Sequence, residues 1–266
     1  MINLANILTA FNLLSGVLSI VLVLNGRIDL GPFFIIAAFV FDFLDGYVAR
    51  KMGTSGPLGA QLDSLADMVT FGVAPAILVM VLMVMDVPGF LSNHHYELIQ
   101  FDFNYWLESL IAGNTNYYLP LLTLVIPFFS LFRLAKFNLD DRQKTSFRGL
   151  PTPANAAFYL SFPLVLSFDY IPLKKSWNSL WWIFDQHFLL VLTLVLSILL
   201  VSDFRLFSLK FQNFRWKSNE IRYSFLLISL VFIIAFGFWS FSLIVFLYLI
   251  LSIIENSILK KEKHEI

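Results

Sequence analysis

Residues 30–86 read LGPFFIIAAFVFDFLDGYVARKMGTSGPLGAQLDSLADMVTFGVAPAILVMVLMVMD. Two apolar runs flank a short polar turn in this stretch, and each is long enough for a helix to cross a ~30 Å hydrocarbon core. Similar runs recur along the chain, which is 58% hydrophobic and only 14% charged. Soluble domains carry about a quarter charged residues. The sequence therefore predicts an all-α polytopic membrane protein.

We expect residues 1–266 to form one integral-membrane domain, a bundle of about eight transmembrane helices with no separate soluble part. The first span lacks the basic start and cleavage site of a signal peptide, so we expect it to be retained. Residues 221–257 are long for one helix, and Gly237 offers a turn, which favours a C-terminal helical hairpin over one tilted helix. The predicted spans are 4–25, 30–51, 58–86, 117–138, 153–171, 186–203, 221–236 and 239–257.

Lys and Arg are distributed unevenly between the two ends of the predicted bundle. The segments at the ends of spans two, four and six, with the C-terminal tail, hold Arg50, Lys51, Arg142, Lys144, Arg148, Arg205, Lys210, Arg215, Lys217, Arg222, Lys260, Lys261 and Lys263. The opposite segments hold Arg27, Lys174 and Lys175. The positive-inside rule then places both termini in the cytoplasm, as in a multi-pass protein of the cell membrane. The aromatic-rich connection 87–116 is expected to be a surface flap on the outer leaflet.

Four aspartates lie near the ends of the two apolar runs quoted above. Asp42 and Asp45 are three residues apart near the end of the second span, so they share one helix face. Asp63 and Asp67 are four residues apart at the start of the third span and share a face in the same way. Because a short cytoplasmic turn joins these helices, we expect the four carboxylates to converge near the cytoplasmic end of the bundle.

Carboxylates within a membrane helix are costly, at about 2.5–3.5 kcal/mol each on insertion scales. Four of them held together also repel one another. Divalent cations remove both costs, and hard oxygen ligands in this number favour Mg²⁺ or Mn²⁺ over zinc or copper. We therefore predict a divalent-cation site; the alternative is a set of interfacial aspartates that face water.

Small residues accompany the acidic faces. Gly46, Ala49 and Gly59 would let a planar base or a diphosphate approach the helices closely, although small residues also serve helix packing in membranes. Arg50 lies one turn beyond Gly46 and could pair with a phosphate. As a single residue, it would equally fit the positive-inside rule.

Other classes of function find little support in the sequence. The absence of cysteine excludes disulfides, thiol nucleophiles and cysteine zinc sites. A formal net charge of zero gives no sign of a nucleic-acid partner, and we expect none. A histidine base is not expected, because the histidines lie outside the acidic segment, at His94, His95, His187 and His264.

The acidic segment matches, position for position, the signature D-x2-D-G-x2-A-R-x8-G-x3-D-x3-D, and on this match the chain resembles the CDP-alcohol phosphotransferases. The match covers residues 42–67, and the surrounding spans are similar to the six-helix core of that family. The resemblance implies that Asp42, Asp45 and Asp63 are the core metal ligands. It implies that Asp67 shares the metal site and acts as general base. It also implies that the CDP moiety is held by Gly46, Ala49, Arg50 and Gly59.

The implied reaction is attack by an alcohol on the β-phosphorus of a CDP-linked lipid, which releases CMP. Two divalent cations, Mg²⁺ or Mn²⁺, would neutralise the diphosphate and orient an in-line displacement. A carboxylate near the cations can be ionised at neutral pH and accept the hydroxyl proton. The resemblance also implies a homodimer, for which the sequence does not identify the interface.

A second informative stretch, 132–156, joins spans four and five. Its FRLAKFN and FRGLPTPANA segments resemble the R-L-A-[RK]-F-N and G-L-P-T-P-A elements of the membrane-integral phosphatidylserine synthases of this family. L-Serine is therefore the expected alcohol, and Arg133 could clamp its carboxylate bidentately. The positive-inside rule is the alternative explanation for the basic residues here. The candidates for the serine site are Arg133, Lys136, Asn138, Arg148 and Thr152.

The expected substrates are thus CDP-diacylglycerol and L-serine. One alternative within the family is a different acceptor, such as glycerol 3-phosphate or an inositol phosphate, which would require more cations around the pocket. An alternative from another class is a cation-coupled transporter, which would place acidic residues near the membrane midplane on discontinuous helices. The clustering of the aspartates toward one face disfavours the transporter.

Overall fold

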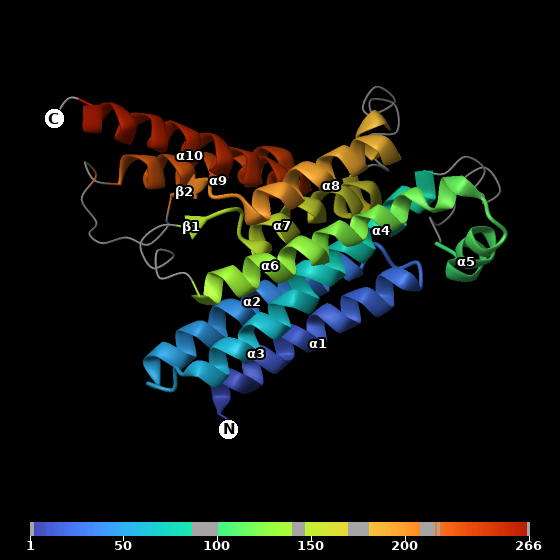
Figure 1. Cartoon of the computed structure of the whole chain (residues 1–266), viewed down its shortest axis with the longest axis horizontal. Helices are drawn as coiled ribbons and strands as arrows, with labels where there is room; N and C mark the ends of the chain where they lie inside the picture. The colour runs from blue at the N-terminus through green and yellow to red at the C-terminus, as the bar shows by residue number, and fades with distance from the viewer. Residues whose placement is uncertain are drawn as a thin grey trace.

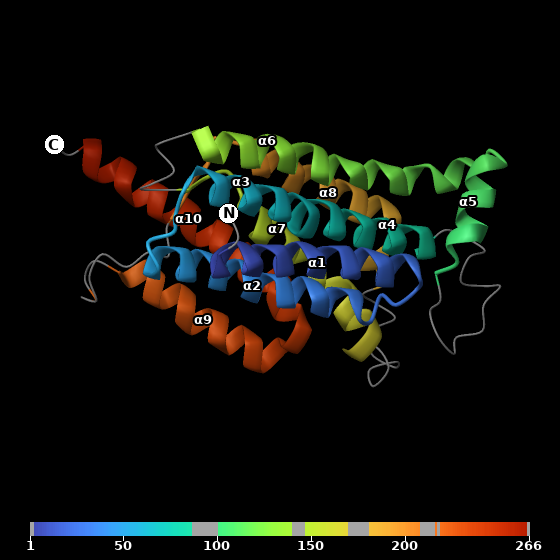
Figure 2. The same ribbon diagram turned by 90° about the horizontal axis from the view of Figure 1, so that it is seen from below.

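The computed structural model describes residues 3–86, 101–139, 147–169, 181–207, 216 and 219–264. These residues form an elongated helical bundle (Figure 1 and Figure 2). Five helical stretches in the described part of the chain are long and apolar enough to cross a membrane: Leu4–Leu24, Gly31–Lys51, Pro57–Met85, Thr115–Leu139 and Glu220–Ser257. The predicted class, an all-α polytopic membrane protein, is confirmed.

Helices α1 (Leu4–Leu24) and α2 (Gly31–Lys51) form the first hairpin. The Asn3 side chain accepts a hydrogen bond from the backbone N–H of Asn6 at 2.8 Å, which caps the start of α1. In the connection to α2, Arg27 and Asp29 form an exposed ion pair at 2.8 Å. The hydrogen bond from the Arg27 guanidinium lowers the pKa of the Asp29 carboxyl below its ordinary value.

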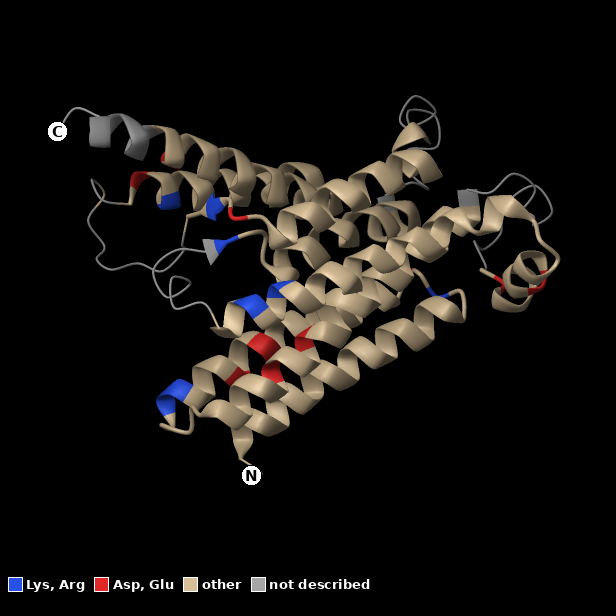
Figure 3. Cartoon of the chain, viewed as in Figure 1, with Lys and Arg blue, Asp and Glu red and all other residues tan. Residues whose placement is uncertain are grey.

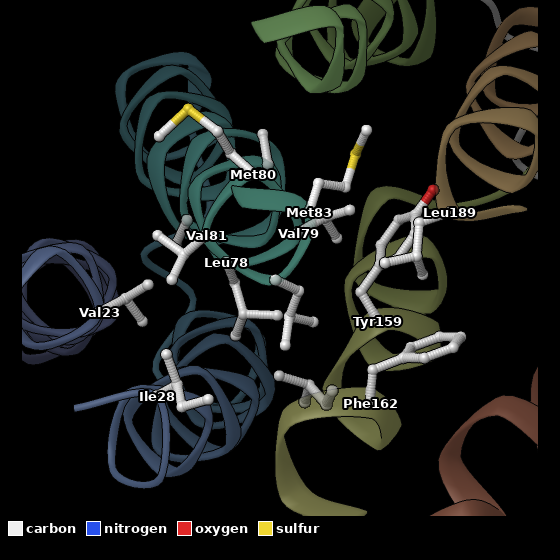
Figure 4. Close-up of a cluster of buried hydrophobic side chains, with 14 of the residues drawn as sticks. Val23, Ile28, Leu78, Val79, Met80, Val81, Met83, Tyr159, Phe162 and Leu189 are labelled. Atoms are coloured by element: carbon white, nitrogen blue, oxygen red, sulfur yellow. The ribbon is translucent and has the colours of Figure 1, made fainter. Parts of the chain in front are cut away.

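The third span is the central helix of the bundle and consists of three parts. Helix α3 (Pro57–Asp67) leads into the π-helical segment η1 (Met68–Val73), which continues as α4 (Ala74–Asp86). In its most apolar window 78% of the residues are buried, against 17–33% for the other four long spans. Figure 4 shows its side chains packed between the α1–α2 hairpin, through Val23 and Ile28, and the helices α7 (Thr152–Leu164) and α8 (Gln186–Val201) on the other side.

The fourth span combines the 3-10 segments η2 (Thr115–Tyr117) and η3 (Leu119–Leu124) with α6 (Val125–Leu139). A short helix, α5 (Phe103–Ile111), precedes it within the 87–116 connection. It lies at the end of the bundle away from both chain termini (Figure 1). This position suits the predicted surface flap; the first part of the connection, 87–100, falls outside the described residues.

The fifth span is α7 (Thr152–Leu164), extended by the π-helical segment η5 (Val165–Asp169), and the sixth is η7 (Trp181–Phe184) followed by α8 (Gln186–Val201). Pro151 and Pro153 flank the start of α7, where the first amides lack helical partners. A feature that the sequence did not predict is a short antiparallel pair, β1 (Phe147–Arg148) with β2 (Arg205–Leu206). It joins the connections on the N-terminal side of α7 and the C-terminal side of α8.

The predicted C-terminal hairpin is confirmed. Helix α9 (Glu220–Phe236) ends at Gly237, η9 (Gly237–Trp239) makes the turn, and α10 (Ser240–His264) runs back (Figure 2). Gly237 has φ 52°, a left-handed conformation that glycine adopts at low cost. Helix α10 packs on α7, where the Ser242 hydroxyl donates to the Phe158 carbonyl at 2.8 Å.

The two ends of the bundle differ in how many Lys and Arg residues they carry (Figure 3). Both marked chain ends lie at the end that carries most of the described Lys and Arg residues, whereas the α1–α2 connection, which contains Arg27, lies at the other end (Figure 1). This arrangement suits the predicted placement of both termini in the cytoplasm, which stays a prediction. The predicted basic residues Arg142, Lys144, Lys174, Lys175, Lys210, Arg215 and Lys217 fall outside the described residues.

Candidate active site

Three of the four predicted aspartates form one cluster between α2 and α3, two helices that both pack on α1. Oxygen atoms of Asp42, Asp63 and Asp67 all lie within 4.8 Å of one another. Ionised carboxylates repel one another at such distances, and a bound cation would remove this repulsion.

Asp45 lies beside this cluster and not within it. Its Oδ2 accepts a hydrogen bond of 2.6 Å from the Thr9 hydroxyl of α1, and the residue is buried. The helical spacing correctly predicted that Asp45 would be on the acidic side of α2. The residue spacing within α2 carries no information about α1. Because α1 packs against α2, the Asp45 carboxylate is bonded to Thr9.

The cluster has the chemistry of a divalent-cation site. Its donors are carboxylate oxygens, the hard ligands that Mg²⁺ and Mn²⁺ prefer. Asp67 is buried at 8% exposure, and Asp42 and Asp63 are half-buried. Within the described chain, no Lys or Arg lies within ion-pair distance of these three residues. Their negative charge is thus concentrated without a compensating side chain, and a bound cation fits this arrangement.

A pocket of about 280 Å³ opens next to the cluster, between α1, α2 and α3. All four residues that the resemblance assigned to the CDP moiety line it: Gly46, Ala49, Arg50 and Gly59. Asp45 and Asp63 line it as well, so the pocket and the acidic cluster are contiguous. The Arg50 guanidinium lies over Gly46, where a Cβ atom would be 3.2 Å from Arg50 Nη1. A larger side chain at position 46 would therefore displace the one arginine that lines the pocket.

Helix α1 contributes to this site in a way that the sequence analysis missed. Asn6 and Thr9 line the pocket, and the Asn12 amide Nδ2 donates to Asp67 Oδ1 at 3.2 Å. A signal was present: polar residues recur at every third position of an otherwise apolar helix, at Asn6, Thr9, Asn12 and Ser15. The other lining residues not predicted are Ala5, Thr54, Ser55, Gly56 and Ala60.

Arg133, the leading candidate for the serine carboxylate, is buried at 3% exposure in α6. Its Nε donates to the Leu150 carbonyl at 3.2 Å, and its guanidinium lies 5.3 Å from the centre of the Phe137 ring. This hydrogen bond ties the end of α6 to the Gly-Leu-Pro segment before α7. Arg133 thus joins the two elements that the sequence analysis assigned to the acceptor.

The other acceptor candidates occupy different surroundings. Lys136 forms an ion pair with Asp203 at 2.8 Å, and the exposed Asn138 donates to the Ser64 hydroxyl of α3 at 2.8 Å. Arg148 lies on β1 opposite Arg205 of β2, and Thr152 is buried at the first position of α7. Asn138 is the candidate linked directly to the acidic helix, because Ser64 follows Asp63.

The chain is similar to a known family of membrane enzymes. The CDP-alcohol phosphatidyltransferase family model matches residues 2–199. The archaetidylserine synthase of Methanothermobacter thermautotrophicus is 34% identical over 165 residues, which are 61% of this chain and 58% of that protein. The CDP-diacylglycerol–serine O-phosphatidyltransferase of Bacillus subtilis is 30% identical over 168 residues, 62% of this chain and 76% of the relative.

A longer match is the CDP-diacylglycerol–serine O-phosphatidyltransferase of Helicobacter pylori strain 26695. It is 27% identical over 230 residues, which cover 86% of this chain and 81% of the relative. The chain spans less than two thirds of the archaeal synthase, so similarity there concerns part of that protein. The family match covers most of this chain and includes the acidic segment. The chain therefore belongs to the CDP-alcohol phosphatidyltransferase family.

Proposed function

We propose that this protein transfers a phosphatidyl group from CDP-diacylglycerol to the hydroxyl of L-serine, giving phosphatidylserine and CMP. The observation that carries the proposal is the contact between the aspartate cluster and the pocket lined by Gly46, Ala49, Arg50 and Gly59. A nucleotide in that pocket would place its diphosphate beside the carboxylates. Relatives named as serine O-phosphatidyltransferases support serine as the alcohol.

The pocket suits the nucleotide end of the donor. Its small residues leave the helix backbones accessible, and Arg50 supplies a planar donor that can form paired hydrogen bonds with a phosphate. Several exposed apolar side chains of α1 and α2, including Phe11, Leu14 and Val40, provide a surface for the acyl chains within the bilayer. The donor would thus lie with its headgroup in the pocket and its tails in lipid.

Asp42, Asp63 and Asp67 would hold the divalent cations, with Asp45 at the edge of the site. When bound, Mg²⁺ or Mn²⁺ supplies Lewis-acid stabilisation of the negative charge on the diphosphate. Asp67 is the most enclosed carboxylate of the three, and we assign it the role of general base toward the serine hydroxyl. The β-phosphorus–oxygen bond to CMP breaks as the bond to the serine oxygen forms.

The serine end of the site is proposed from the segment 132–156. Asn138, whose amide donates to the Ser64 hydroxyl next to Asp63 in the sequence, would orient the polar groups of serine. The Nε atom of Arg133 already donates to the Leu150 carbonyl. Arg133 would therefore bind the serine carboxylate through its two other guanidinium nitrogens. Lys136, Arg148 and Thr152 remain candidates, with Lys136 available after exchange of its partner Asp203.

The proposed setting is the cytoplasmic membrane, with the acidic end and both termini in the cytoplasm. The gathering of described Lys and Arg at that end supports this orientation (Figure 3). A homodimer is proposed from the family resemblance.

The test is reconstitution of the purified protein in liposomes with CDP-diacylglycerol and measurement of CMP release. Serine should be required for release, and EDTA should abolish it until Mg²⁺ or Mn²⁺ is added back. Equal release with glycerol 3-phosphate or an inositol phosphate would replace serine by another acceptor. No release with any alcohol, in the presence of either cation, would refute the proposed activity.

A further inference from the structure

Asn12 of α1 contacts Asp67 across the helix interface. Its Nδ2 donates to Asp67 Oδ1 at 3.2 Å, and the Asn12 side chain is completely buried. The two residues are 55 positions apart in the sequence, so the contact depends on the packing of α1 against the third span. Burying an amide side chain in an apolar membrane helix costs free energy unless the amide has hydrogen-bond partners.

The backbone around Asn12 is held in place by the same segment that follows Asp67. The Thr70 hydroxyl of η1 donates to the Asn12 carbonyl at 3.1 Å. Gly16, one turn further along α1, lies so close to Thr70 that a Cβ atom would meet its hydroxyl and backbone. The Asn12 amide lies on α1 and the Asp67 carboxylate on the third span. These two helices are therefore in close contact directly beside both groups.

Chemistry determines which end of the amide faces Asp67. An ionised carboxylate only accepts hydrogen bonds, so the NH₂ group of the amide must face it and the amide oxygen must point away. That oxygen, Asn12 Oδ1, is buried and has no hydrogen-bond partner among the described residues. The orientation of the amide is thus set by its bond to Asp67 and by no second bond that the structure describes.

We infer that Asn12 is a positioning residue for the proposed base and metal ligand Asp67, a role that rests on the proposed function. Its N–H holds Oδ1 and thereby directs Oδ2 and the remaining lone pairs of Oδ1 toward Asp42 and Asp63. Thr9, one turn earlier on the same face of α1, holds Asp45 by the same means at 2.6 Å. One face of α1 thus orients one carboxylate from each acidic helix.

The experiment compares the full-length wild type with Asn12→Leu, which keeps a similar volume without a donor, and Asn12→Ala, which cannot overpack the site. Ser15→Ala is the matched control, because the Ser15 hydroxyl donates only to the Phe11 carbonyl of its own helix in the described structure. Mn²⁺ affinity is measured by electron paramagnetic resonance without lipid substrate. CMP release gives kcat and the KM for CDP-diacylglycerol, and melting temperature reports the fold.

Loss of a residue that orients a metal ligand typically costs tenfold to a hundredfold in affinity or activity. We expect a loss of about that size in Mn²⁺ affinity and in kcat for both Asn12 variants. The KM for CDP-diacylglycerol should stay within about twofold, because Asn12 does not line the pocket, and Ser15→Ala should match the wild type. If the Asn12→Leu variant does not fold, Mn²⁺ affinity and kcat of the Asn12→Ala variant test the inference.

Mn²⁺ affinity and kcat within twofold of wild type in a folded variant would overturn the inference. A rise in donor KM and a fall in melting temperature, with Mn²⁺ affinity unchanged, would also overturn it by showing a purely structural role. If the wild type releases no CMP with any alcohol, the proposed function fails, and the Mn²⁺ comparison still decides whether Asn12 positions Asp67.

Discussion

Gly46 and Gly59 line the same pocket, and their surroundings differ at the scale of single atoms. A Cβ atom at position 59 would be 3.7 Å from the Asn6 side chain, which is ordinary van der Waals contact. A Cβ atom at position 46 would be 3.2 Å from the end of the flexible Arg50 side chain, which can shift. Neither glycine has a positive φ, so the protein alone does not require glycine at either place.

Gly59→Ala and Gly46→Ala should therefore fold normally and bind the donor less well. A methyl group in a site shaped for its ligand costs about tenfold or more, so we expect the KM for CDP-diacylglycerol to rise by roughly that factor. Melting temperature and CMP-release kinetics check this. An unchanged donor KM in folded Gly59→Ala would show that the nucleotide does not occupy this pocket.

Asp67→Asn should abolish turnover while donor binding persists, because an amide cannot accept the hydroxyl proton. A fall in kcat of at least about 10²-fold is expected, with CDP-diacylglycerol affinity nearly unchanged. Asp29→Asn at the other end of the bundle is the control; it breaks an exposed ion pair worth about 0–1 kcal/mol and should retain activity. An equal loss of binding and turnover in Asp67→Asn would contradict its assignment as the base.

At the scale of elements, the segment 149–150 connects four parts of the fold. The backbone N–H of Gly149 donates to the Phe204 carbonyl and that of Leu150 to the Leu199 carbonyl, both at 2.9 Å. The Leu150 carbonyl accepts the bond from Arg133. The end of α6, the start of α7, the end of α8 and the β1–β2 pair are thereby held together beside the proposed acceptor site.

Gly149→Ala should destabilise this junction. Gly149 has φ 76°, and a Cβ atom there would collide with the backbone carbonyls of Leu200 and Ser202. We expect a loss of about 2–4 kcal/mol of unfolding free energy, from the left-handed backbone and the overpacking together. Thermal unfolding in detergent measures it.

Gly113→Ala is the control for that experiment. Its φ is 82°, and nothing lies within 4 Å of its Cβ position, so only the backbone cost of about 1–2 kcal/mol applies. If both variants lose the same stability, the crowding at Gly149 has no energetic consequence.

At the scale of the whole molecule, the bundle has two chemically different ends. The aspartates of α2 and α3 and both marked chain ends lie toward one end, and α5 lies at the other (Figure 2 and Figure 3). Arg27, in the α1–α2 connection, is paired with Asp29. An enzyme that draws serine and CDP-lipid from the cytoplasm would need the acidic end on that side.

Single cysteines can test this orientation without background, because the chain contains no cysteine. Met52 at the acidic end is 55% exposed, and Ile111 in α5 is 75% exposed. In intact cells a membrane-impermeant maleimide should label Ile111→Cys, and should label Met52→Cys only after permeabilisation. The reverse pattern would invert the proposed topology.

Much of the fold was predictable because it depends on local properties of the chain. Apolar runs predicted the spans, and Gly237 predicted the turn between α9 and α10. The π-helical segment η1, directly after Asp67, was not predicted; it packs on both α1 and α6, and such contacts between helices are not contained in the local sequence. The β1–β2 pair was also missed, because two-residue strands have no periodicity.

The sequence by itself determined the membrane class, the acidic faces of α2 and α3, and four of the residues that line the proposed nucleotide pocket, Gly46, Ala49, Arg50 and Gly59. These follow from spacing along single helices and one short turn. Only the tertiary structure decided that Asp42, Asp63 and Asp67 form one cluster while Asp45 turns to Thr9, and that Asn12 holds Asp67. The physical reason is that helical periodicity specifies a direction around one axis, whereas the distance between side chains of different helices depends on how closely those helices pack.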